Sequence, residues 1–230
     1  PATTSPAGGV TTTALVTTTV APLPVVPSPG VYRYVTAGYE SVDVLGGARH
    51  DYPAETTITV VPDGCGVLLR WDALAERRDE WRLCATADGI VLQPDGLQFH
   101  EFFGSADDEA IHCEQSVVLV PADGEPRPAT AQQCLLADEA WAPLWEVLDT
   151  SEQVVDGAAV EVTHVRMTVA SDNGAGGGLG EHTVIDWYLD ATGLPVSAGG
   201  TKDSVSSSPI GDVDDQETFT LQLASLTPLR

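Results

Sequence analysis

The side chains in this sequence best suited to acid–base or metal chemistry near neutral pH are its five histidines. His164 and His182 flank a glycine-rich loop, so they could lie opposite each other on paired strands, within reach of Asp186 and Glu181. Such a group could bind a metal. Two polar residues on the solvent face of a hairpin explain the same pattern more simply. No Gly-x-Ser-x-Gly motif occurs, so nothing in the sequence supports a serine-hydrolase nucleophile.

Acidic residues form the second candidate site. Asp212, Asp214 and Asp215 alternate in a way that resembles a calcium loop, and we predict them as the metal ligands. The glycine and the distal glutamate of an EF-hand are absent, and a similar pair occurs at Asp107-Asp108. An acidic turn between two strands is therefore the competing interpretation, since Asp favours turns. Calcium is the one cofactor that the sequence suggests.

The four cysteines do not fit a zinc site, because no two of them lie two to four residues apart. Of the three possible connectivities, sequential pairing is favoured, with Cys65 bonded to Cys84 and Cys113 bonded to Cys134. Each bridge would stabilise the fold by roughly 3 kcal/mol through the loop that it closes. Disulfides form outside the cytoplasm, so they predict an extracytoplasmic protein.

A predicted hairpin supports the first of these bridges independently. Residues 64–71 and 78–84 are rich in apolar and β-branched side chains, and a short polar turn at 73–76 separates them. A register centred on that turn aligns a charge pair, an aromatic–aliphatic pair and two cysteines. The predicted facing pairs are Arg70–Asp79, Leu68–Trp81 and Cys65–Cys84.

Two long stretches of the chain resemble each other. Trp81–Leu119 and Trp187–Leu223 both begin with Trp-x-Leu and continue with a glycine and an apolar pair. Each then has an acidic turn and a final apolar run. Self-similarity of this kind indicates an internal duplication. We therefore predict two copies, at about residues 31–122 and 143–230, joined by a connection over residues 123–142.

The predicted fold is all-β and mainly antiparallel, with the two tandem repeats forming one large curved sheet or half-barrel within residues 31–230. The connection contains the only stretch with helical composition, residues 131–141, which we predict as a short helix ending before Pro143. Four apolar residues in and after it would cover the sheet and are the candidate ligand-binding residues. They are Leu135, Leu136, Trp141 and Trp145.

The N-terminal residues 1–30 are rich in Pro and Thr and carry no charge, which predicts a disordered stalk or linker. The formal net charge of −24 makes nucleic acid an unlikely class of partner and opposes binding to an anionic membrane surface. No stretch is long and apolar enough to predict a transmembrane helix.

The run from Trp187 to Pro195 and the final apolar strand resemble uncharacterised cell-envelope proteins, secreted or lipid-anchored, of high-GC Gram-positive bacteria. In architecture, a large antiparallel sheet with a covering segment is similar to the half-barrel lipoprotein carriers of the LolA and LppX/LprG kind. This resemblance implies a concave face that holds acyl chains.

Taken together, these features favour a non-enzymatic binding or interaction module tethered to the outer face of the cell membrane. Its expected partner is a cell-envelope component or an apolar small molecule. A carrier of an apolar or lipid ligand is the first alternative, because a carrier needs an open apolar cavity. An extracellular hydrolase is the second, and it would need titratable groups converging in a cleft.

Overall fold

The computed structural model describes residues 23–43, 46–102, 105–137, 139–172, 180–208 and 211–229. These residues form one antiparallel sheet of sixteen strands, and they contain no helix. The strands are β1 (Gly30–Asp43), β2 (Ala48–Asp51), β3 (Glu55–Asp63), β4 (Gly66–Asp72), β5 (Arg77–Thr86), β6 (Gly89–Phe102), β7 (Ser105–Cys113), β8 (Val117–Pro121), β9 (Arg127–Ala131), β10 (Cys134–Leu136), β11 (Glu139–Trp141), β12 (Leu144–Val155), β13 (Ala158–Asp172), β14 (Gly180–Leu189), β15 (Pro195–Ser208) and β16 (Gly211–Leu223).

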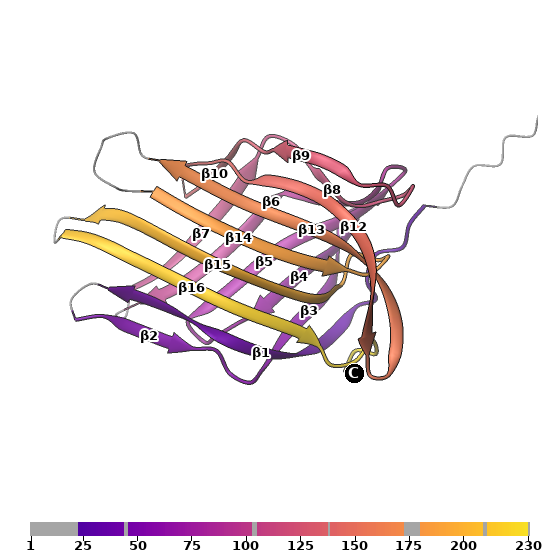
Figure 1. Ribbon diagram of the computed structural model, residues 1–230, viewed down its shortest axis with the longest axis horizontal. Coiled ribbons are helices and arrows are strands. Elements are labelled where there is room, and N and C mark those ends of the chain that lie inside the picture. Colours follow the sequence, from indigo (N-terminus) through magenta and orange to yellow (C-terminus); the bar gives the residue numbers. More distant parts are fainter. Residues whose placement is uncertain are drawn as a thin grey trace, which may run out of the picture.

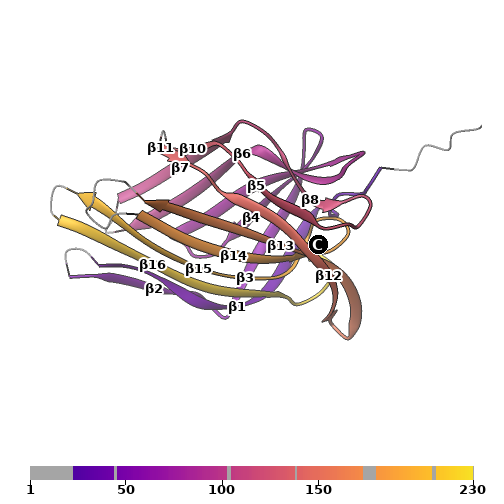
Figure 2. The same cartoon turned by 45° about the horizontal axis from the view of Figure 1, so that its top comes forward.

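The sheet is open and strongly curled, so it forms a half-barrel with two facing walls (Figure 1). Strands β12–β16 form the orange and yellow wall, and β3–β7 form the purple and pink wall behind it. The first and last long strands join the walls, because β1 pairs with β16 on one side and with β3 on the other. Figure 2 shows the same two layers from a tilted direction.

The two edges of the sheet are β11 and β9. β9 ends at Ala131 and β10, the neighbour of β11, begins at Cys134, so only Gln132 and Gln133 separate strands that lie at opposite ends of the sheet order. The chain itself therefore crosses the seam between the two walls. β8, which pairs with β6, also contacts β12 and β13 at this seam.

Strand alternation places one face of every long strand in the interior. Ile58, Leu69, Trp71, Val165 and Leu221 are almost completely buried there, although they come from both walls. Each such side chain contributes about 1.5–3 kcal/mol through burial. The interior of the curled sheet is therefore the hydrophobic core, and no separate layer covers it among the described residues.

Both predicted disulfides are present, Cys65–Cys84 and Cys113–Cys134, with Cα–Cα distances of 5.4 and 3.9 Å. They indicate an oxidising, extracytoplasmic environment. The hairpin of β4 and β5 is also present, but the predicted register is wrong by one residue, since Leu69 faces Trp81 and Gly66 faces Cys84. Leu74 and Arg77 exchange two backbone hydrogen bonds, so the turn is centred one residue further along the chain than expected.

The predicted helix at residues 131–141 is not found, because this segment forms β10 and β11. Cys134 pairs with Cys113 on β7 both as a strand partner and through the disulfide, and this holds the backbone extended. Tertiary context thus outweighs the helical composition of the segment.

The tandem repeat stays a prediction. The meanders β4–β5–β6–β7 and β13–β14–β15–β16 each run in consecutive order along the sheet. The predicted stalk falls mostly on residues 1–22, which lie outside the described part of the chain. Among the described residues, no helix is long and apolar enough to cross a membrane.

Candidate functional site

A partly open cavity of about 160 Å³ lies between the two walls of the half-barrel. Its lining comes mainly from the inner faces of β5 and β6 on one wall and of β13, β14 and β16 on the other. All five tryptophans of the chain line this one cavity, namely Trp71, Trp81, Trp141, Trp145 and Trp187. They are separate in the sequence, so the curl of the sheet is what gathers them.

Trp81 on β5 and Trp187 on β14 meet across this space, with ring centroids 5.7 Å apart and planes inclined by 55°. On one side, the strand partner of each is small, since Trp81 faces Gly96 on β6 and Trp187 faces Ala198 on β15. A larger neighbour on the same face would compete with the indole for room. The small partners therefore let both rings turn into the interior.

The turn after β14 closes one end of this interior. Asp190 Oδ1 accepts hydrogen bonds from the backbone N–H of Thr192 at 2.8 Å and of Leu194 at 3.0 Å. Gly193 has a φ of 86°, and a Cβ placed on it would lie 2.8 Å from Ile90 Cγ2. The turn thus packs directly onto the opposite wall, which explains the glycine in the Trp187–Pro195 motif.

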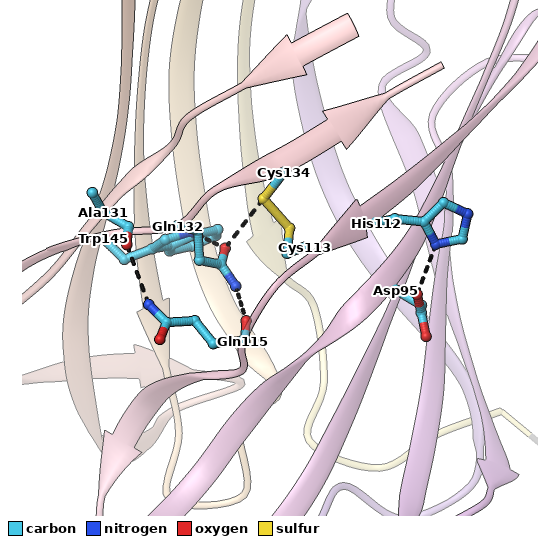
Figure 3. The surroundings of a disulfide bond; sticks show 8 residues. All are labelled: Asp95, His112, Cys113, Gln115, Ala131, Gln132, Cys134 and Trp145. Carbon is cyan, nitrogen blue, oxygen red and sulfur yellow. Dashed lines mark hydrogen bonds and ion pairs between the residues drawn. A yellow bond between two sulfur atoms is a disulfide. The ribbon is translucent and has the colours of Figure 1, made fainter. Parts of the chain in front are cut away.

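The seam beside the cavity is held by a buried glutamine (Figure 3). Gln132 is 1% exposed, its amide nitrogen donates to the Gln115 carbonyl at 2.6 Å, and its Oε1 accepts from the Trp145 indole at 2.9 Å. The Cys113–Cys134 disulfide lies next to it. Gln132 therefore links the Trp145 indole on β12 to the connection between β7 and β8.

A buried polar network borders the other side of the cavity. Arg77, at the start of β5, contacts Glu217 and Tyr52, with 3.2 Å from its Nη1 to the Tyr52 hydroxyl, and lies 3.5 Å from Glu40 Oε2. Its Nη2 lies 3.3 Å from Asp79 Oδ2. Tyr52 donates to Glu217 Oε1 at 2.7 Å. These groups come from four strands or loops far apart in the sequence.

The three carboxyl groups of this network differ in the direction in which their pKa values are shifted. Burial alone would raise the pKa of Glu217, but Arg77 and the Tyr52 hydroxyl outweigh it and lower the pKa. For Asp79, burial raises the pKa and Arg77 offsets only part of the rise. Burial also raises the pKa of Glu40, against the opposing effects of His50 and Arg77. Arg77 thus stabilises the charge of Glu217 more fully than that of Asp79 or Glu40.

Three of the four predicted ligand-binding residues line a cavity, and one does not. Trp141 and Trp145 line the cavity, and Leu136 lines a smaller adjoining one of about 60 Å³. Leu135 is 46% exposed and lines neither cavity. Ligand binding by these residues stays a prediction.

The predicted metal site at His164 and His182 finds no geometric support. His164 faces Tyr188 while His182 faces Ala170, so the two histidines are six residues apart along β13 and β14. His164 instead bonds Asp186 at 2.8 Å and stacks on Tyr188. Within the described residues, no group of three or more His, Cys, Asp or Glu side chains could hold a metal ion.

The predicted calcium ligands lie at the start of β16. Asp214 is exposed, whereas Asp215 Oδ2 lies 3.1 Å from Lys202 Nζ on β15. Calcium binding by this segment stays a prediction.

Several residues of this site were not predicted from the sequence, namely Arg77, Asp79, Gln132 and Glu217. A weak signal exists for two of them, since Arg77 and Asp79 fall on the same odd-numbered positions of the strand as the apolar Trp81 and Leu83. Comparison with protein-family models, curated proteins and solved structures finds no match for this chain.

Proposed function

We propose that this protein is a non-enzymatic binding module of the cell envelope that holds a small apolar ligand in the tryptophan-lined cavity. The observation that carries the proposal is the convergence of all five tryptophans on one unfilled space. Ligand sites are typically concave and apolar, with few polar groups.

The size of the cavity supports a ligand with the dimensions of one aromatic ring. An apolar cavity of about 150 Å³ engineered into another protein stays dry and binds benzene. The volume of about 160 Å³ found here is comparable. Long acyl chains would need more space, so a small ring or a short chain fits better than a lipid.

The burial of the tryptophans favours a ligand site over a filled core. Trp71 is 2% exposed and belongs to the core, whereas Trp81, Trp141 and Trp187 remain only partly buried. Rings that are only partly buried around a cavity keep accessible surface for a ligand.

The setting of the cavity supports a role in the cell envelope. The half-barrel is compatible in architecture with a carrier fold, and the two disulfides indicate an extracytoplasmic environment. The sequence of residues 1–30 is suited to a tether. The proposed partner is a cell-envelope component that supplies the ligand to this protein or receives the ligand from it.

A titration with toluene tests the proposal. Tryptophan emission is measured at an excitation wavelength that toluene does not absorb, and saturable quenching or enhancement is expected. The test variant is Ile185→Phe, because Ile185 lines the cavity beside Trp187 and is only partly buried. A larger side chain there fills the space and should weaken toluene binding at least about tenfold, a loss of about 1.4 kcal/mol.

The matched control is Val154→Phe, which adds a similar ring at a position that is 64% exposed on β12. Its toluene affinity should equal that of the wild type. Absence of a saturable response in the wild type, or equal affinity in Ile185→Phe with its fold intact, would contradict the proposed function.

A further inference from the structure

We infer that the ligand of the cavity is an organic cation, a small aromatic or short-chain amine whose ammonium group binds Asp79. This inference rests on the proposed function and narrows its ligand to one with a small apolar body and a charged amine. It starts from one atom. Asp79 lines the cavity, its Oδ2 is 3.3 Å from Arg77, and its Oδ1 is buried without a hydrogen-bond partner among the residues that the structure describes.

A buried carboxylate oxygen without a donor is costly, and such atoms are uncommon in native proteins. Arg77 cannot easily supply the missing bond, because it already contacts Glu217, Glu40 and Tyr52 as well as Oδ2. Oδ1 has almost no accessible surface in the present side-chain orientation, so the carboxylate must turn toward the cavity for a ligand donor to satisfy it. Hydrogen bonds to a charged group are the strongest of this kind.

The charges around the site favour a cation over a neutral donor. Among the charged residues that line the cavity, Asp79, Glu80 and Asp95 are acidic and Arg77 is basic. The polar side of the cavity therefore has more negative than positive groups. The net charge of −24 adds a long-range field that attracts cations and repels anions.

The tryptophans provide the complementary part of such a site. Cations are attracted to the face of an aromatic ring, most strongly to tryptophan, and aromatic groups recognise substituted ammonium ions. Trp81 and Trp187 stand together on opposite walls, and Trp81 lies on the same strand face as Asp79, two residues away. One amine can thus contact an indole and the carboxylate together.

Calorimetric titration with four probes of similar size tests this inference. The probes are toluene, 2-phenylethanol, 2-phenylethylamine and 3-phenylpropionate. At neutral pH the amine should bind at least about tenfold more tightly than the alcohol, and the carboxylate should bind most weakly. Asp79→Asn should remove the preference for the amine, so that the amine and the alcohol bind with affinities within about twofold of each other. Asp88→Asn is the matched control, because Asp88 is exposed in the turn between β5 and β6.

Each outcome has a defined meaning. Equal affinity for the amine and the carboxylate, or an undiminished preference for the amine in folded Asp79→Asn, overturns the inference. If Asp79→Asn does not fold, the comparison of the four probes on the wild type decides. Toluene binding without a preference for the amine leaves the proposed function standing and removes only this inference, whereas no binding of any probe removes both.

Discussion

Trp81 and Trp187 lie 5.7 Å apart between ring centroids, although five strands separate β5 from β14 in the order of the sheet. Such a contact is possible only because the sheet curls until its two walls face each other. The distance between these indoles therefore reports directly on the curl. A larger separation between the two walls would increase the volume of the cavity, and a smaller separation would reduce it.

Gly193 controls this spacing at one end of the interior, and Gly193→Ala should destabilise the protein more than its backbone strain alone explains. Its φ of 86° is costly for alanine, by about 1–2 kcal/mol. The new methyl group would also meet Ile90 and Leu83 at 2.8 and 2.9 Å, and overpacking of this kind costs a further ~1–3 kcal/mol. Urea denaturation measures the total loss.

Gly157→Ala separates the two effects. Gly157 has a similar φ of 79°, but no atom lies within 4 Å of the position that its Cβ would take. This variant should therefore lose only the backbone contribution. Equal losses of unfolding free energy in Gly193→Ala and Gly157→Ala would show that the turn at Gly193 does not pack closely against the opposite wall.

His100 should make the protein less stable in mild acid. Burial, with added repulsion from Arg77 and Lys202, lowers the pKa of His100 to about 3. Because this is below the unfolded value of about 6.5, the neutral ring contributes stability above that pH, and the contribution is lost as the pH falls from about 6.5 to about 3. At about pH 5 the loss should reach about 2 kcal/mol.

The measurement compares urea denaturation of the wild type, His100→Asn and His182→Asn over this range of pH. His182 is exposed on β14, so its variant should retain the pH dependence of the wild type. In His100→Asn, the part of the pH dependence of stability that comes from the histidine should be absent. If the wild type and His100→Asn respond identically to pH, His100 is not held in its neutral form.

Gln132 should be a stability determinant of the seam. Gln132→Leu leaves the Trp145 indole N–H and the Gln115 carbonyl without their partner, at an expected cost of about 2–4 kcal/mol. The neighbouring Gln133 is exposed, so Gln133→Leu should change stability by less than about 0.5 kcal/mol. Thermal unfolding measured under oxidising conditions tests the difference, and two equal melting temperatures would refute the role of Gln132.

Local patterns in the sequence were sufficient for part of this structure. The spacing of four cysteines predicts both disulfides, and alternation of apolar residues predicts an antiparallel all-β fold. The predicted register of β4 and β5 was wrong by one residue. The actual register depends on the backbone hydrogen bonds between Leu74 and Arg77 in the turn, and composition does not specify these bonds. The helix at 131–141 was wrong because the strand partner at Cys113 lies outside the segment.

The site itself depends on contacts between residues far apart in the sequence, which form only when the sheet curls. Resemblance between the stretches that begin at Trp81 and Trp187 is visible in the sequence, but their contact across the interior follows only from the curl of the sheet. The same holds for Arg77 and Glu217, whose charges are 140 positions apart in the chain and in contact in the fold. Such pairs have no local signal.

The most direct test of the account is the indole region of a nitrogen–proton correlation spectrum during titration with toluene. The chain has five tryptophans and all of them line the cavity, so five indole signals report on its occupancy. The account predicts saturable shifts of the Trp81 and Trp187 signals in the wild type and their loss in Ile185→Phe. Indole signals that stay in place while toluene shifts only surface amides would contradict it.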